Sequence, residues 1–317
     1  MNIAGFFAGV GGIELGFKNA GFNIIYANEI DKNAALTYVY NHKHKLVVED
    51  IAKLNDIPNI DMIVAGFPCQ AFSIAGYQKG FNDERGNVFF TLAKIIKDKK
   101  PSVVFLENVK NLKSHDSGKT YETIFSTLNN MGYYVTSSVL NACEYANTPQ
   151  NRERIYIVGF LNKTAFDNFS FPSKEKLNKK ISDIVDFDKK VDDKYYYSDK
   201  NCKNYEMVKN GVINRDTIYQ YRRIYIRENK NNLCPTLTAN MGTGGHNVPL
   251  VLTKYGIRKL TPKECFMFQG FPKDFKLPNI ADSHLYKQAG NSVVVPMIEK
   301  IAQNIKLAIY SNNKEKL

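Results

Sequence analysis

Short apolar runs alternate with helix-like segments through the first half of the chain. The runs at 2–7, 22–28 and 61–66 have the length of single strands, and the segments at 13–20 and 31–41 carry apolar residues at helical spacing. Further strands are expected at 102–106, 135–140 and 155–160, and further helices at 88–97 and 120–131. Strands that alternate with helices form a mostly parallel sheet covered on both faces. The pattern therefore predicts a doubly wound α/β fold.

The alternation stops near Pro172. From there to about Tyr255 the chain is rich in Lys, Asp, Asn and Tyr and shows no regular pattern. Regularity returns with Thr261-Pro262-Lys263-Glu264, which has the form of a capping box with proline at the first helical position, and with a last helix over 296–309. We therefore expect four parts, at 1–172, 173–256, 257–284 and 285–317: a doubly wound domain, a smaller irregular domain, a connecting segment, and a segment that returns to the first domain.

The composition is that of a globular protein with a basic surface. The formal net charge is +12 and the pI is about 9.2, which suits a polyanionic partner such as nucleic acid or reflects a Lys- and Asn-rich solvated surface. The five cysteines have no close pairs and the histidines are scattered, so we expect a reducing cytoplasm and no metal site. No apolar run approaches the roughly 20 residues that span a membrane.

A glycine turn, FAGVGG, follows the first strand and opens the first helix. Gly9 and Gly11 allow close approach of a ligand, but Glu14 stands where a dinucleotide fingerprint has its last glycine. A carboxylate there disfavours a pyrophosphate, and S-adenosylmethionine fits better. Glu29 ends the second strand and Asp50 follows the third, where they can accept from ribose hydroxyls and an adenine amino group. Each acid alone is better explained as a helix N-cap or a surface carboxylate, but the two together, at successive strand ends, favour a nucleoside.

The stretch GFPCQAFS ends the strand at 61–66 with a cysteine. A Cys69 thiolate would be the best nucleophile available at neutral pH. The alternative is a small packed residue, which Pro68 and the polar Gln70 and Ser73 argue against. The glycine-punctuated residues that follow, 68–87, are predicted to form a loop that closes over a substrate.

Two further motifs carry charge next to predicted strands. Glu107, in ENV, ends a buried strand, where burial would favour its protonated form; the alternative is an exposed acid paired with Lys110. Arg152 and Arg154, in QNRERIY, are two residues apart and would share one face of a strand, where they could hold a carbonyl oxygen or a phosphate. The alternative for each arginine is a surface ion pair with Glu153 or a neighbouring acid.

The chain closely resembles the DNA (cytosine-5)-methyltransferases of bacterial restriction–modification systems. The resemblance lies in the order and spacing of six motifs: FAGVGG, GFPCQAFS, ENV, QNRERIY, RKLTPKECFMFQGFP and GNSVVVP. The resemblance covers nearly the whole chain. It is weakest at the start, where Gly5 and Phe6 replace the acidic residue and leucine that the family usually carries.

The resemblance implies a reaction and the residues that perform it. Cys69 would add to C6 of a cytosine flipped out of the duplex, Glu107 would contact N3 and the amino group, and Arg154 with Arg152 would hold O2. S-adenosylmethionine would give its methyl group to C5 and leave as S-adenosylhomocysteine. The implied cofactor pocket consists of Phe7, Ala8, Gly9, Gly11, Gly12, Glu29, Ile30, Asp50, Ile51, Pro68, Asn291 and Ser292.

The same resemblance implies that 1–172 is the catalytic and cofactor-binding domain and that 257–284 is a hinge. It also implies that the variable region at 173–256 recognises the target, in double-stranded DNA. The implied DNA-contacting residues are Gln70, Ser73, Arg85, Arg222, Arg223, Arg227, Thr236, Leu237, Gly244 and Gly245. The segment TLTANMGTGGHNVP resembles the corresponding segment of enzymes that act on sites with a CC step, such as CCNGG or CCGG. A monomeric bacterial cytoplasmic enzyme is expected, with a cognate restriction endonuclease acting separately.

Three other functions fit parts of the sequence. A tRNA cytosine methyltransferase would share the architecture, but such enzymes carry a Cys-Phe-Thr signature. The nearest match here is Cys265-Phe266-Met267, in a motif that the DNA enzymes share. A non-catalytic DNA-binding relative would lack PCQ or ENV, and both are intact. An NAD-linked oxidoreductase is disfavoured by Glu14.

Overall fold

The computed structural model describes residues 1–68, 88–222, 224–229, 231–243 and 247–311. Its internal contacts divide the chain into two compact units. Unit 1 comprises Met1–Leu140, Glu153–Ser173 and Met297–Leu317, and unit 2 comprises Asn141–Arg152 and Lys174–Pro296. The functional division expected at residues 172, 256 and 284 stays a prediction.

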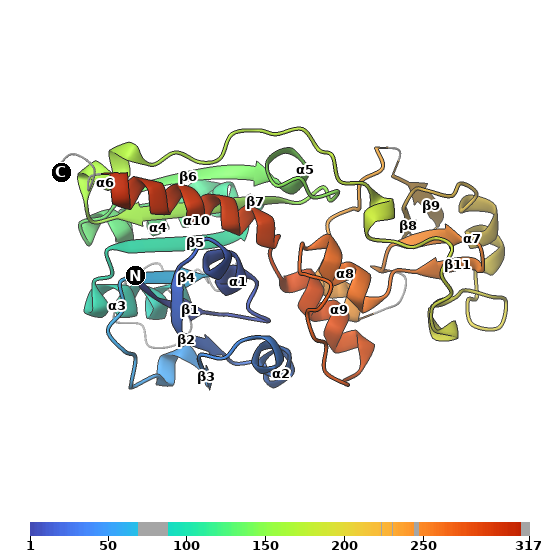
Figure 1. The fold of residues 1–317 in the computed structure, drawn as a ribbon, viewed down its shortest axis with the longest axis horizontal. Coiled ribbons are helices and arrows are strands. Elements are labelled where there is room, and N and C mark those ends of the chain that lie inside the picture. The colour runs from blue at the N-terminus through green and yellow to red at the C-terminus, as the bar shows by residue number, and fades with distance from the viewer. Residues whose placement is uncertain (69–87, 223, 230, 244–246, 312–317) are drawn as a thin grey trace. The chain divides into compact units, whose positions relative to one another are not determined.

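A seven-stranded sheet forms the centre of unit 1 (Figure 1). Its strands, in spatial order, are β3 (Lys45–Val48), β2 (Asn23–Glu29), β1 (Asn2–Phe6), β4 (Met62–Ala65), β5 (Val103–Val109), β7 (Glu153–Phe160) and β6 (Tyr134–Asn141). The pairs from β3 to β5 are parallel, and β7 runs antiparallel to β5. Because chain order reverses at β1, the carboxyl ends of β1 and β4 form a topological switch point, where such sheets bind ligands.

Helices cover both faces of this sheet, which confirms the predicted doubly wound α/β class. They are α1 (Gly12–Asn19), α2 (Lys32–Asn41), α3 (Val88–Lys99), α4 (Lys119–Asn130), α6 (Lys163–Asn168) and α10 (Val295–Tyr310). On one face Phe89 of α3 packs into the main apolar cluster. On the other, the Phe17 ring of α1 lies 5.2 Å from that of Phe105. Gly16 lets α1 approach α10, since a Cβ there would lie 2.6 Å from the Cβ of Ile298.

Unit 2 contains a second, antiparallel sheet with the order β11-β10-β8-β9. Its elements are α5 (Ala142–Tyr145), α7 (Tyr205–Gly211), β8 (Tyr219–Arg222), β9 (Tyr225–Glu228), β10 (Leu250–Thr253), β11 (Gly256–Lys259), α8 (Pro262–Phe268) and α9 (Asp282–Asn291). The region predicted to be irregular is therefore partly regular. Its strands span only four residues each, which is too short for their alternation to stand out from the surrounding polar sequence.

The capping box predicted at the start of α8 is confirmed. The Thr261 hydroxyl accepts from the Glu264 amide, and the Glu264 carboxylate accepts from the Thr261 amide at 2.7 Å. The same carboxylate accepts hydrogen bonds from both terminal nitrogens of Arg258, at 2.7 and 2.8 Å, and Arg258 is completely buried. A buried, two-point ion pair of this kind is costly to break on one side only, because the remaining charge loses its partner.

Glu14 is a buried acid in the first turn of α1 and explains the unusual Gly5. The Glu14 side chain is 1% exposed, and a Cβ on Gly5 would lie 2.0 Å from its Oε1. The Glu14 carboxyl therefore occupies the space that a side chain at position 5 would need. Burial, with a further contribution from the charge of Glu29, raises the pKa of Glu14 from 4.5 to about 8. Glu14 is consequently protonated and neutral at pH 7.

We expect Glu14→Gln to remove a pH dependence of stability. The folded protein keeps the Glu14 proton up to about pH 8, whereas the unfolded chain loses it near pH 4.5. Since the unfolded chain binds fewer protons over this interval, the free energy of unfolding falls as pH rises through it. The variant should escape that fall and gain a few kcal/mol on the wild type between pH 5 and pH 8, at about 1.4 kcal/mol per pKa unit.

Urea unfolding of both proteins at pH 5 and pH 8 measures this difference. Glu122→Gln, which removes an exposed carboxyl from α4, is the matched control. Parallel stability curves for the wild type and Glu14→Gln would show that Glu14 does not hold its proton in the folded state.

Candidate active site

The turn after β1 is built from residues in left-handed backbone conformations. Phe7, Gly9 and Gly11 have φ of 54°, 56° and 86°. This conformation is strained for phenylalanine but not for glycine, and strain of this kind is concentrated at functional sites. A Cβ added to Gly9 would meet nothing within 4 Å, so the backbone there faces open space. The turn can therefore accept a ligand against its main chain.

Glu29 connects this turn to the end of β2. Its Oε2 accepts from the Gly9 amide and its Oε1 from the Asp31 amide, both at 2.7 Å. Each carboxylate oxygen has more than one lone pair, so both can also accept from a ligand hydroxyl. The next residue, Ile30, is 63% exposed and presents an apolar side chain beside this carboxylate. A polar acceptor beside an exposed apolar side chain suits a nucleoside.

The other residues of the expected cofactor pocket have different positions. Ala8, Gly12 and Ile51 are buried, and Pro68 is exposed after β4. One oxygen of Asp50 caps the short 3-10 helix Ile51–Lys53 by accepting from the Ala52 amide at 3.0 Å. Asn291 and Ser292 lie at the end of α9 in unit 2.

Glu107 and Arg154 form an ion pair near the carboxyl end of β5. Arg154 Nε lies 3.3 Å from Glu107 Oε1, and the two side chains are 13% and 11% exposed. They come together because antiparallel β5 and β7 pair Glu107 with Tyr156 and Val109 with Arg154. The exposed alternative for Glu107 is wrong, since it is Glu153 that pairs with Lys110. A largely buried acid beside a guanidinium can bind a neutral ring that carries both an acceptor and a donor.

The asparagine of ENV has a role that its sequence motif does not reveal. Asn108 is buried, and its amide nitrogen donates to the Phe67 carbonyl at 2.8 Å. Asn108 thus holds the chain that leaves β4 directly against the end of β5. A buried asparagine in an otherwise apolar strand is the signal that could have identified it.

Seven of the predicted site residues lie outside the described residues: Cys69, Gln70, Ser73, Arg85, Arg223, Gly244 and Gly245. The described cysteines include two that are unsuited to nucleophilic attack. Cys234 and Cys265 are completely buried, which raises the pKa of both thiols well above its usual value. Protonated thiols are poor nucleophiles, so neither cysteine is suited to that role.

Arg152 is almost completely buried in unit 2. It is 3% exposed, and its guanidinium donates to the backbone carbonyls of Leu237, Gly290 and Ser292. The surface ion pair with Glu153 is therefore the wrong alternative for this residue.

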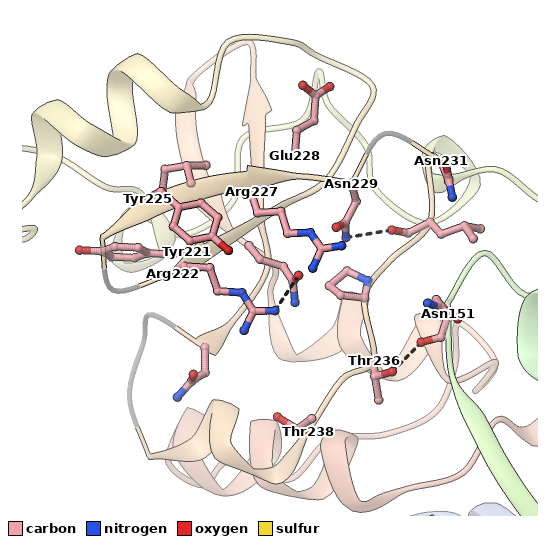
Figure 2. Close-up of a pocket in the computed structure, with 15 residues that line it drawn as sticks. Asn151, Tyr221, Arg222, Tyr225, Arg227, Glu228, Asn229, Asn231, Thr236 and Thr238 are labelled. Carbon is pink, nitrogen blue, oxygen red and sulfur yellow. Dashed lines mark hydrogen bonds between the residues drawn. The ribbon is translucent and has the colours of Figure 1, made fainter. Parts of the chain in front are cut away.

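An open pocket of about 880 Å³ lies beside the β8–β9 hairpin of unit 2 (Figure 2). The register pairs Gln220 with Arg227 and Arg222 with Tyr225, so these four side chains share one face of the hairpin. A terminal nitrogen of Arg222 donates to Gln220 Oε1 at 3.1 Å, which orients the guanidinium. In the close-up, Arg222 and Arg227 project into the pocket. A concave, polar, basic surface of this kind fits an anionic polymer.

The opposite wall of the pocket includes Thr236 and Thr238, which flank Leu237; residues 236–238 are called the Thr-Leu segment below. Thr236 is exposed, and its hydroxyl donates to the Asn151 carbonyl at 2.6 Å (Figure 2). Leu237 is completely buried, so its side chain packs in the core of unit 2 and only its neighbours reach the pocket.

The described residues contain neither a helix that is long and apolar enough to cross a membrane nor a group of three His, Cys, Asp or Glu side chains placed to hold a metal ion.

The switch-point glycine turn and the doubly wound sheet with its antiparallel β7 define the fold of the S-adenosylmethionine-dependent methyltransferases. The structure of Spodoptera frugiperda DNMT2 superimposes with a TM-score of 0.74 at 20% identity, covering 96% of this chain and 99% of that one. A putative DNA modification methyltransferase encoded within an E. coli prophage gives 0.70 at 22% identity, covering 98% and 99%.

The chain belongs to the C-5 cytosine-specific DNA methylase family, whose model matches residues 1–307, and it is a DNA (cytosine-5)-methyltransferase. It is 56% identical over 309 residues to the Type II methyltransferase M.Bsp6I of Bacillus sp. (strain RFL6), covering 96% of this chain and 98% of that protein. It is 40% identical to the Type II methyltransferase M.HhaI of Haemophilus parahaemolyticus, covering 94% and 92%. The family predicted from the order of motifs is confirmed.

Proposed function

We propose that the protein methylates C5 of a cytosine that is flipped out of a short duplex site, through a covalent bond between the Cys69 sulfur and C6. The Glu107–Arg154 pair is the observation that carries this proposal. It presents a carboxyl group and a guanidinium side by side, which match the N3 and amino edge and the O2 atom of cytosine. The base must leave the helix because these side chains cannot reach it within the stack.

The chain's own residues account for the activation of the ring. The Cys69 thiolate adds to C6, and the electron pair of the C5–C6 double bond is pushed toward C5 as Glu107 stabilises the charge that builds at N3. Arg154 holds O2 and keeps Glu107 in place. After C5 has been methylated, its proton is lost to a base and the sulfur leaves C6, which restores the aromatic ring. The elimination regenerates the Cys69 thiolate, so the enzyme is restored at the end of the cycle.

S-adenosylmethionine supplies the methyl group when bound. The open backbone at Gly9 and the Glu29 carboxylate beside exposed Ile30 fit its nucleoside, and neutral Glu14 adds no negative charge to the site. The resemblance adds Asn291 near the methionine end. Asp50, which already caps a 3-10 helix, retains a second oxygen for the adenine amino group.

For the DNA we propose the pocket between the β8–β9 hairpin and Thr236, with Arg222 and Arg227 as its cationic side chains. Arginine binds both phosphates and guanine edges. The protein would act as a cytoplasmic monomer, alongside a separate cognate endonuclease, on a site that contains a CC step.

We expect the purified protein to transfer label from S-adenosylmethionine to double-stranded DNA and not to tRNA. Bisulfite sequencing of the product then reports both the recognised site and the modified base. Label that appears only on tRNA would overturn the DNA assignment. The Cys265-Phe266-Met267 segment, which lies in buried helix α8, gives no support to the RNA alternative.

A further inference from the structure

The guanidinium of buried Arg152 donates hydrogen bonds to main-chain carbonyls of two distant segments. Its Nη1 donates to the Leu237 carbonyl at 2.6 Å, and its Nη2 donates to the carbonyls of Gly290, at 3.1 Å, and Ser292. The last two belong to the C-terminal end of α9, where carbonyls lack partners within the helix and a cation is favoured. The Arg152 guanidinium therefore caps α9 and also bonds to the main chain of the Thr-Leu segment.

Gln150 holds the same segment from its other side. Its Oε1 accepts from the Leu237 amide at 3.2 Å, and its amide nitrogen donates to the Phe268 carbonyl at 2.8 Å. Gln150 is completely buried. The amide and the carbonyl of Leu237 are thus both bonded to side chains of one short stretch, Gln150 to Arg152.

The backbones that these two side chains join also pack without space between them. A Cβ on Gly290 would lie 2.1 Å from the carbonyl carbon of Thr238. Asn151, Thr236 and Thr238 all line the pocket beside the β8–β9 hairpin. The segments that Arg152 fixes therefore form one wall of that pocket.

We infer that Arg152 is a positioning residue for DNA recognition and does not touch the target base. It holds the wall formed by residues 236–238 against the end of α9, through three hydrogen bonds donated by the two terminal nitrogens of its planar guanidinium. With 3% of its surface exposed, Arg152 has almost no area left for a substrate. This inference rests on the proposed function and reassigns the base-contacting role to Arg154 alone.

A duplex with 2-thiocytosine at the target position tests the base contact. Sulfur is a weaker acceptor than O2, so an arginine that binds this atom should lose discrimination when it is replaced. We expect the ratio of kcat/KM for cytosine over 2-thiocytosine to stay within about twofold of the wild-type ratio in Arg152→Lys. The ratio should approach one in the comparison variant Arg154→Met, whose side chain cannot donate a hydrogen bond. A ratio that collapses in Arg152→Lys would overturn the inference.

The Arg154→Met protein decides the matter even if Arg152→Lys does not fold. Methionine cannot donate a hydrogen bond, so if Arg154 alone binds O2, no discrimination remains in Arg154→Met; a substantial residual ratio would mean that Arg152 also binds it. In Arg152→Lys itself, a loosened pocket wall should raise KM for DNA about tenfold, while kcat stays within about threefold of the wild type. A fall in kcat with unchanged KM would contradict a positioning role.

Hydrogen exchange provides a readout that needs no methyl transfer. We expect the amides of 236–239 to exchange about tenfold faster in Arg152→Lys, with the strands of unit 1 unchanged. Unchanged exchange there would overturn the inference. A wild-type protein that leaves DNA unmethylated would instead overturn the proposed function, and the exchange result would still decide whether Arg152 holds this wall.

Discussion

Replacing Cys69 with serine is expected to abolish methyl transfer to DNA, with a loss in kcat of at least about 10⁴-fold. A serine hydroxyl is almost entirely protonated at neutral pH and lacks the nucleophilicity of a thiolate, so addition to C6 fails. Without that addition C5 remains too poor a nucleophile to take a methyl group. Binding of S-adenosylmethionine should survive, because the Gly9–Glu29 contact and exposed Ile30 are unaffected.

Two measurements separate these effects. A duplex with 5-fluorocytosine at the target should become covalently joined to the wild-type protein and not to Cys69→Ser, while calorimetry follows cofactor binding in both. Cys143→Ser, which changes a partly exposed cysteine of α5, is the matched control and should retain activity. Normal turnover by Cys69→Ser would remove this sulfur from the reaction.

The second large effect is expected for Glu107→Gln, which should lower kcat by about 10²- to 10⁴-fold with little change in cofactor affinity. Glutamine preserves the shape of the side chain but cannot take up or release a proton as charge develops on the ring. It also leaves Arg154, at 3.3 Å, without its anionic partner in a largely buried position. DNA affinity should change much less than kcat, because the basic pocket of unit 2 is intact.

Glu153→Gln is the matched control for this prediction. Glu153 is the next residue to Arg154 along the chain, yet its carboxylate pairs with Lys110 and is 40% exposed. Surface pairs of this kind contribute little, so the control should turn over at nearly the wild-type rate. Equal losses in kcat for the two variants would indicate a general electrostatic effect and not a specific role for Glu107.

The order of the strands and motifs could be predicted because local sequence carries it. Apolar runs of strand length marked β1, β2, β4, β5 and β7, and each chemical motif lies at one end of such a strand: FAGVGG after β1, Glu29 and ENV at the ends of β2 and β5, GFPCQAFS after β4, and QNRERIY at the start of β7. Parallel strands bring their carboxyl ends to one edge, which is why FAGVGG, Glu29 and ENV could be assigned to one cleft before any contact was known. The Thr261–Glu264 capping box was equally predictable, since its partners are three residues apart.

The contacts of the arginines could not be predicted in the same way. Arg152 and Arg154 were expected to act together because they are two residues apart, but one binds backbone carbonyls and the other binds Glu107. The carbonyls of Leu237 and Gly290 lie 85 and 138 residues further along the chain. Every residue type has a carbonyl, so no side-chain pattern marks these two as partners.

The sequence by itself determined the doubly wound fold and the family, because these follow from local periodicity and from motifs whose residue types are dictated by chemistry. Only the tertiary structure decided that Glu14 is a neutral buried acid filling the space above Gly5, that Asn108 braces Phe67, and that Arg152 caps a helix. Each of these depends on which distant atoms share a small buried space, and burial decides both protonation and hydrogen-bond partners.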